Sequence, residues 1–337
     1  MSIIWAGGED LDFPNGVVPG VSTTTGNFRA GWARCAISPG GNSISNFMKS
    51  TPFDGGATIT SGWLRWYAAS TGTDANTGFF IGFGNLSTSA VLGVYVTGGA
   101  RTWALGKNEA GTITQFAATT VAANSGANVT HRYDLQVTNY GASGTLSLYI
   151  DGNFIISYTG NIAMTGVSNF NCVQISNGAQ NAYIVFSEII AADESTLGFQ
   201  GLATLAPNGN GTTQAWSNPA YTNFNPISYG SDLNSTFTNT TGQDEQATMI
   251  AVPTGTFQIK CVKVIARAMA TAGAAATNLK IGFNNTNNGT VAEGATHALS
   301  TGFAPVEDYF ATDPTSAGGT GAWGANLTGY QLELRSA

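Results

Sequence analysis

The stretch TLSLYIDGNFIISY, from Thr145 to Tyr158, is the part of the sequence that best determines the fold class. Hydrophobic residues alternate with polar or half-exposed ones on both sides of the dipeptide Asp151-Gly152. Such alternation is typical of a β-strand with one buried face, and an Asp-Gly pair supplies the backbone freedom that a tight hairpin turn needs. The stretch therefore predicts a β-hairpin. Its alternating hydrophobic residues are Leu146, Leu148, Ile150, Phe154, Ile156 and Tyr158.

Short runs of the same kind recur outside this hairpin. They are rich in β-branched and aromatic residues, and clusters of Gly, Asn, Ser and Thr separate them. This spacing predicts an antiparallel sandwich or jelly roll. In the early run SGWLRWY (Ser61–Tyr67), large side chains occupy both alternating faces, so we expect a strand that is covered on both sides. Helical propensity is confined to the alanine-rich Ala266–Ala276, which we interpret as a strand that ends in a loop.

The composition excludes several classes of protein. The 337 residues include only 12 basic and 19 acidic side chains, 9% of the chain, against about 25% in an average soluble protein. Coiled coils and helical bundles need far more charged residues, whereas the 42% hydrophobic content argues against disorder. The net charge of −7 includes no basic stripe, so we expect no nucleic-acid partner. No apolar segment approaches the length of a membrane span, so we expect no membrane insertion.

The strand pattern breaks once, and this break predicts two domains. It falls in the stretch AADESTLGFQGLATLAPNGNGTTQAW, where an acidic turn is followed by several glycines and Pro207. We predict a first β-sandwich over residues 1–195, a linker over residues 196–210 and a second, smaller β-sandwich over residues 211–337. The predicted fold class is all-β.

The first of these regions resembles a known fold family. The run HRYDLQVTNYGASGTLSLYIDGNFIISYTG (His131–Gly160) and the later YIVFSEIIAADE (Tyr183–Glu194) resemble strands of concanavalin A-like lectins and laminin-G-like domains. The opening EDLDF (Glu9–Phe13) is similar as well. The resemblance covers about residues 1–195 and implies a jelly-roll sandwich, a fold that hosts lectins, hydrolases and structural modules.

A second resemblance extends over the chain as a whole. The segment LGFQGLATLAPNGNGTTQAWSNP (Leu197–Pro219) and the ending FATDPTSAGGTGAWGANLTGYQLELRSA (Phe310–Ala337) resemble virion structural proteins of tailed bacteriophages. The segments Asp232–Pro253 and Lys260–Phe283 are similar to them too. This resemblance implies a non-enzymatic virion protein, made in the host cytoplasm, whose partners are other virion proteins.

Within the virion, the resemblance favours a tail fibre or tail-tip protein that displays a lectin-like domain for attachment to the host surface. A capsid decoration or head-fibre protein is the alternative, and a carbohydrate-binding module is another that can coexist with either. A polysaccharide depolymerase is least favoured. Particle symmetry makes a homotrimer the default oligomer.

The sequence contains no pattern that predicts catalysis. Glycosidases of this fold class need paired carboxylates, and no E-x-D-x-E run occurs. Neither His131 nor His297 is accompanied by a marked nucleophile and acid, so we expect no enzyme and no cofactor. Asp10 and Asp12 are weak candidates for a calcium site, and an exposed acidic edge beside Phe13 is the alternative.

Aromatic residues in loops are the candidates for ligand contacts. We single out Trp103 with Arg101, near the glycine turn Gly98-Gly99, and Tyr140, in an Asn/Gly loop, because loops at the ends of a sandwich carry recognition. The three cysteines, Cys35, Cys172 and Cys261, lie far apart and among apolar or small residues. We expect them to be buried, reduced thiols.

Overall fold

The computed structural model describes residues 3–7, 13–16, 20–22, 36–38, 47–70, 79–97, 102–122, 130–177, 184–193, 205, 207–217, 235–249, 251 and 258–337. These residues form β-strands, loops and two 3₁₀ turns, which confirms the all-β prediction. The chain divides into two compact units, Met1–Ala203 and Thr204–Ala337. The division falls inside the expected linker 196–210, but strand β16 already begins at Pro207.

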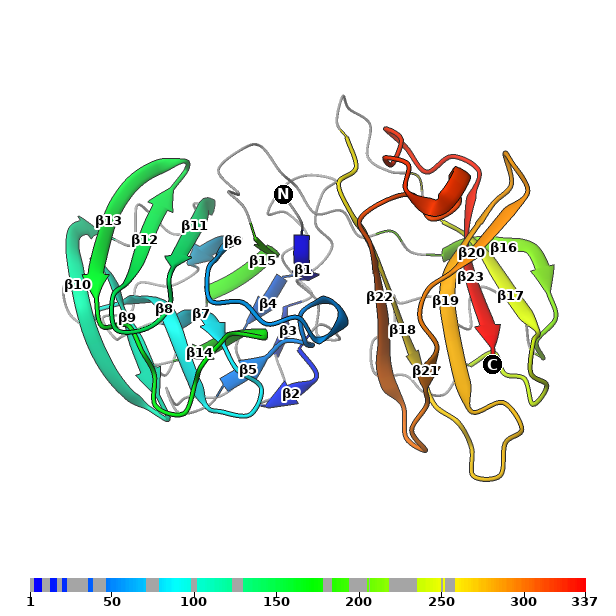
Figure 1. The fold of residues 1–337 in the computed structure, drawn as a ribbon, viewed down its shortest axis with the longest axis horizontal. Coiled ribbons are helices and arrows are strands. Elements are labelled where there is room, and N and C mark those ends of the chain that lie inside the picture. The colour runs from blue at the N-terminus through cyan, green and yellow to red at the C-terminus, as the bar shows by residue number, and fades with distance from the viewer. Residues whose placement is uncertain are drawn as a thin grey trace. The chain divides into compact units, whose positions relative to one another are not determined.

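Unit 1 is a sandwich of two antiparallel sheets (Figure 1). The first sheet has the order β13 (Asn153–Gly160), β12 (Gly144–Ile150), β11 (Thr130–Thr138), β6 (Gly62–Ser70), β15 (Ile184–Ala192), β4 (Ala36–Ser38) and β3 (Gly20–Ser22), and β1 (Ile3–Gly7) also pairs with β15. The second sheet has the order β10 (Thr112–Ala122), β9 (Thr102–Glu109), β8 (Ala90–Val96), β7 (Phe79–Gly84), β14 (Cys172–Asn177), β5 (Phe47–Lys49) and β2 (Asn15–Gly16). This arrangement is consistent with the predicted jelly roll.

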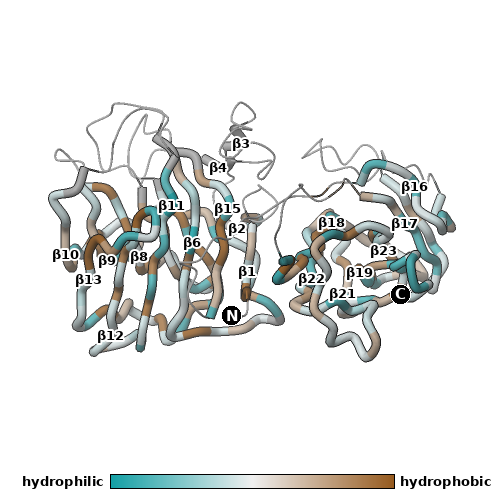
Figure 2. The backbone as a smooth tube through the Cα atoms, turned by 90° about the horizontal axis from the view of Figure 1, so that it is seen from above, coloured by the Kyte–Doolittle hydropathy of each residue, from teal (hydrophilic) through white to brown (hydrophobic). Residues whose placement is uncertain are grey.

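Strand β6 shows how the alternation of side chains builds the core of unit 1. Leu64 and Trp66 are fully buried between the sheets, and Trp66 stacks on Tyr133 of β11 with ring centroids 5.4 Å apart. Arg65 points to the opposite face and is also fully buried. The expected coverage of this strand on both sides is therefore confirmed. Hydrophobic and hydrophilic residues alternate in short stretches along the strands of both units (Figure 2).

The predicted hairpin is formed by β12 and β13, with Asp151 and Gly152 in its turn at φ 51° and 84°. Both values lie in the left-handed region that a two-residue hairpin turn requires.

Beyond the turn, one detail differs from the predicted alternation. Leu148 pairs with Ile156, but the next residue, Tyr149, pairs with Phe154, which leaves Ile155 as an extra residue in β13. Such a β-bulge shifts the side chains that follow relative to the partner strand. Phe154 therefore lies beside Tyr149, with 59% of its surface exposed, and does not continue the row of Ile156 and Tyr158.

The outermost strands of the two sheets, β10 and β13, are held together by an aromatic contact. Phe116 of β10 stacks on Tyr158 of β13 with centroids 4.9 Å apart and planes only 14° from parallel. The contact fixes β13, an edge strand of the first sheet, to the second sheet.

Unit 2 contains a larger and a smaller antiparallel sheet. The larger one, the third sheet, has the order β16 (Pro207–Gln214), β17 (Asp244–Met249), β23 (Tyr330–Ser336), β19 (Asn278–Asn285) and β20 (Thr290–Glu293), and β21 (His297–Ala298) also pairs with β19. The smaller one pairs β18 (Val262–Ala268) with β22 (Ala304–Phe310). The alanine-rich segment leaves β18 at Ala268 and continues as a turn and loop, as predicted.

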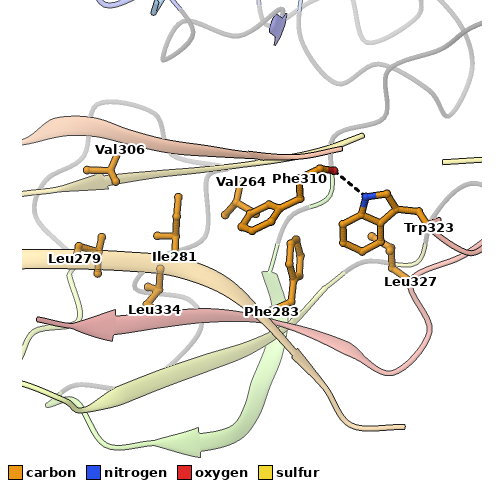
Figure 3. Packing of buried hydrophobic residues seen from close by; sticks show 9 residues of the cluster. All are labelled: Val264, Leu279, Ile281, Phe283, Val306, Phe310, Trp323, Leu327 and Leu334. Atoms are coloured by element: carbon orange, nitrogen blue, oxygen red, sulfur yellow. Dashed lines mark hydrogen bonds between the residues drawn. The ribbon is translucent and has the colours of Figure 1, made fainter. Parts of the chain in front are cut away.

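Phe283 of β19 lies at the centre of the core of unit 2 (Figure 3). Its fully buried ring meets Phe310 at 5.2 Å and Trp323 at 5.5 Å, both edge to face. The indole Nε1 of Trp323 donates to the carbonyl oxygen of Phe310 at 2.8 Å. This bond lets a large amphipathic ring lie in the core without leaving its N–H unsatisfied.

We predict that Phe283→Ala lowers the free energy of unfolding by about 3–5 kcal/mol, because it removes apolar contacts and leaves a cavity. Phe237→Ala is the matched control, since 59% of the surface of Phe237 is already exposed, and it should cost less than about 0.5 kcal/mol. Denaturant unfolding of the full chain measures both. Equal effects of the two variants would contradict the assigned core.

Candidate functional site

Three aromatic side chains lie together on the outer face of the first sheet of unit 1. Trp63 of β6 and Tyr149 of β12 have ring centroids 5.5 Å apart, and Tyr149 and Phe154 of β13 follow at 5.7 Å. We call these three residues the aromatic row. Exposure rises along it, from 8% for Trp63 through a half-buried Tyr149 to 59% for Phe154. The last two rings are inclined by 72°, so they form an open corner.

Hydroxyl groups lie on the same face beside the row. Ser147 of β12 pairs with Ser157 of β13, and Thr145 pairs with Thr159. The hydroxyls of Thr145 and Thr159 are 3.0 Å apart, and Ser157 and Thr159 are exposed. The exposed part of this face thus combines aromatic rings with groups that both donate and accept hydrogen bonds.

The charged groups of the face lie further in and are bonded to one another. Arg132 Nε donates to Asp134 Oδ2 at 2.9 Å, and Asp134 is fully buried. Arg65 lies next to them and donates from Nη2 to the Tyr67 hydroxyl at 3.3 Å. Burial lowers the pKa of Arg65, while the charge of Asp134 counteracts this effect. These groups form a largely buried electrostatic network on the same sheet as the row.

A histidine and a carboxylate are in contact at the hairpin turn. His131 Nδ1 lies 2.7 Å from Asp151 Oδ2, and the backbone N–H of Arg132 donates to Asp151 Oδ1 at 3.0 Å. The carboxylate of Asp151 therefore links strand β11 to the hairpin turn.

The structure places Trp103 where it cannot contact a ligand. The ring is 3% exposed and packs between the sheets against Tyr133, with centroids 4.8 Å apart. The prediction that Trp103 stacks on a ligand is wrong for this reason: it belongs to strand β9, and its side chain is part of the core.

Tyr140 connects two loops of unit 1. Its hydroxyl accepts from the Met164 N–H at 2.7 Å and donates to the Val167 carbonyl at 3.2 Å. The ring packs on Phe170 at 4.4 Å. These contacts give Tyr140 a structural role, and a ligand contact by this residue stays a prediction.

Several predicted residues lie outside the described ones, namely Arg101, Asp10, Asp12 and Cys35. The part of the chain that the structure describes contains no group of three or more His, Cys, Asp or Glu residues placed to hold a metal ion. It contains no helix that could cross a membrane either. Burial raises the pKa of Cys172 to about 12, so this thiol stays protonated, whereas Cys261 is only half buried.

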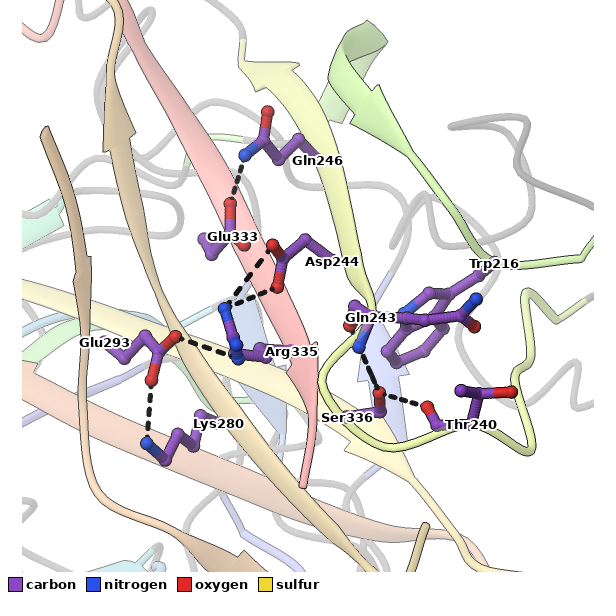
Figure 4. A network of polar contacts seen from close by, with 10 residues as sticks. All are labelled: Trp216, Thr240, Gln243, Asp244, Gln246, Lys280, Glu293, Glu333, Arg335 and Ser336. Atoms are coloured by element: carbon purple, nitrogen blue, oxygen red, sulfur yellow. Dashed lines mark hydrogen bonds and ion pairs between the residues drawn. The ribbon is translucent and has the colours of Figure 1, made fainter. Parts of the chain in front are cut away.

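Unit 2 brings together carboxyl groups that no local sequence pattern marks (Figure 4). Arg335 of β23 bonds Asp244 of β17 at 3.2 Å and Glu293 of β20 at 3.3 Å, and Lys280 of β19 bonds Glu293 at 2.7 Å. Glu333, one alternation before Arg335 on β23, accepts from Gln246 Nε2 at 2.5 Å. Four adjacent strands thus contribute to one polar network.

Glu333 carries a proton at neutral pH. Its side chain is fully buried, and burial is the main cause that raises its pKa to about 8. The hydrogen bond from Gln246 opposes this shift, whereas the charges of Asp244 and Glu293 add to it. Since Glu333 has no exposed surface, we assign it to the stability of unit 2 and to no reaction.

Comparisons with known proteins are confined to the fold. No protein-family model and no curated protein matches the sequence. Among solved structures, the carbohydrate-binding module CBM66 from Bacillus subtilis matches at 12% identity and a TM-score of 0.38, over 53% of this chain and 94% of that one.

Two further structures are similar at the same level. The alginate lyase Aly36B covers 58% of this chain and 100% of its own at 12% identity, with a TM-score of 0.37. The galectin LEC-6 from Caenorhabditis elegans covers 45% and 99% at 16% identity, with a TM-score of 0.28. Likeness this weak carries no argument about function.

We predict that the protein loses stability as the pH rises from about 5 to about 8. In this range Glu333 is ionised in the unfolded chain but protonated in the folded one, so the folded state binds more protons. Burial also raises the pKa of Glu245, which contributes with the same sign. Glu333→Gln keeps the shape without the titration and should flatten the dependence, as measured by denaturant unfolding at several pH values. An equally steep dependence in the variant would contradict the assignment.

Proposed function

We propose that unit 1 is a carbohydrate-binding module and that the protein acts by binding rather than by catalysis. The observation that carries this proposal is the exposed corner formed by Phe154 and Tyr149, with the hydroxyls of Ser157 and Thr159 on the same face. Aromatic rings accept the C–H face of a sugar ring, and hydroxyl groups exchange hydrogen bonds with sugar hydroxyls.

The size of the expected interaction follows from the exposure of Phe154. A phenylalanine buries about 150–250 Å² in full contact, and 59% of the surface of Phe154 is available. At about 25 cal/mol per Å², covering all of this exposed surface contributes about 2–4 kcal/mol. Phe154 is therefore expected to contribute a large share of the free energy of ligand binding.

The carboxylates of this face support a non-enzymatic role. In strands β6, β11, β12 and β13, Asp134 is the single acidic residue, and it is fully buried beside Arg132. Hydrolysis of a glycosidic bond ordinarily uses two carboxyl groups on either side of the bond. Asp151, in the turn beside the row, contacts His131 and accepts from the backbone N–H of Arg132. The strands of the row can therefore hold a glycan, but they supply one buried carboxylate and no pair for cleavage.

We further propose that the protein belongs to the virion of a tailed bacteriophage and attaches it to a host-surface glycan. The support is the resemblance of Leu197–Pro219 and Phe310–Ala337 to virion structural proteins, together with the low content of charged residues. The tail is the favoured location, and a capsid decoration or head fibre is the alternative. Other virion proteins are the partners, and a homotrimer is the expected assembly.

Substitution of the most exposed ring tests the binding function. Phe154→Ala should reduce retention on host-surface polysaccharide at least about ten-fold, because the stacking contact is lost. Phe154→Tyr keeps the ring and should retain most of the binding. Affinity electrophoresis in gels that contain the polysaccharide provides the measurement.

Phe237→Ala is the matched control for this experiment, because Phe237 has the same exposed fraction of 59% but lies in unit 2. It should leave retention unchanged. If Phe154→Ala binds as well as the native protein, or if both variants lose binding equally, the aromatic row is not the binding site.

The proposed location has its own test. Electron microscopy of intact particles, labelled with an antibody against this chain, should show label at the tail. Label confined to the head would favour the decoration alternative, and particles without label would contradict the virion proposal.

A further inference from the structure

The part of the outer face that β12 and β13 form carries no ionisable side chain other than tyrosine. Strands β12 (GTLSLYI) and β13 (NFIISYTG) contain no Asp, Glu, Lys, Arg or His. Phe154, Ser157 and Thr159 are the exposed residues of this part of the face. A ligand seated on the corner therefore meets rings and neutral hydroxyl groups on β12 and β13. The charged groups nearest to it belong to the hairpin turn and to β11, where the Asp151 side chain is 51% exposed.

The nearest basic side chains are bonded to carboxylates. Arg132 is bonded to the buried Asp134, and His131 is bonded to Asp151 in the hairpin turn. Arg65 is fully buried next to Asp134. The carboxylate partners offset the charge of these basic groups, so a negatively charged ligand would gain little net attraction.

Binding an anionic sugar on this surface would also carry a desolvation cost. A carboxylate or sulfate that loses water needs a charged or strongly donating partner in return. The hydroxyls of Ser157 and Thr159 donate single neutral bonds, which are weaker than charge-assisted ones. Neutral sugar hydroxyls are matched well by the same groups.

From this distribution of charge we propose that the aromatic row binds neutral, hydroxyl-rich glycans and discriminates against glycans that carry uronic acid, sialic acid or sulfate. The inference rests on the proposed carbohydrate-binding function and names its ligand class. The single occupant that we assign to the face is thus an uncharged polysaccharide chain.

The experiment uses the full-length protein and a panel of soluble polysaccharides, with neutral glucan, mannan and galactan on one side and hyaluronan, polysialic acid and heparin on the other. We expect binding to at least one neutral member, lost in Phe154→Ala and retained in Phe237→Ala. The apparent Kd should change less than about two-fold between 50 and 500 mM NaCl, because no ion pair is screened.

The outcomes separate this inference from the function on which it rests. If binding depends on Phe154 but selects the acidic polysaccharides and weakens about ten-fold or more in salt, the glycan-binding function stands and the neutral class is wrong. If no polysaccharide binds, both fall. If Phe154→Ala instead changes only the sedimentation coefficient, the face is an interface between copies of the chain, and both proposals fail.

A gain-of-function variant gives a second and independent test. Ser157→Lys adds a cation on an exposed position of β13 beside the corner. It should raise affinity for the acidic polysaccharides by about three-fold or more at low salt and lose this gain in 500 mM NaCl. If the variant prefers neutral over acidic polysaccharides as strongly as the native protein does, the absence of charge on this face does not set the selectivity.

Discussion

The register of β12 against β13 changes by one residue between Leu148 and Tyr149, and the outer face of unit 1 depends on this change. A regular ladder would have continued the row of Ile156 and Tyr158 through Phe154. The extra residue Ile155 instead places Phe154 beside Tyr149, while Ile156 and Tyr158 keep their places on the other side. The aromatic row and the proposals built on it follow from this single bulge.

Both units contain few charged side chains, and in both some of these side chains are bonded to one another. The chain has only 31 Asp, Glu, Lys and Arg residues. Among the described residues, several of them form small networks, such as Arg132 with Asp134 and Arg335 with Asp244 and Glu293. Exposed ion pairs add little stability, whereas buried ones offset their desolvation only with good geometry and further hydrogen bonds. For the buried Glu333, desolvation instead raises the pKa to about 8, which favours the neutral, protonated form.

The sequence predicts the parts of the fold that depend on local pattern. The Asp151-Gly152 turn and the coverage of β6 on both faces follow from alternation and turn residues. The bulge at Ile155 could not be foreseen, because no glycine or proline marks it. The neighbouring glycines predict a loop position for Trp103, yet the structure places it in strand β9 with its side chain in the core. The carboxyl groups of unit 2 meet only when strands far apart in the chain become neighbours, so no spacing could reveal them.

The stacking of Phe116 on Tyr158 has a consequence for how unit 1 would meet a ligand. An edge strand is ordinarily the part of a sheet that frays first, but Tyr158 holds β13 from the face opposite Phe154. The strand that carries the most exposed ring is therefore already ordered before a ligand arrives. Association at this surface would lose little conformational entropy, so its strength would be set by the area of contact rather than by the cost of ordering the receptor.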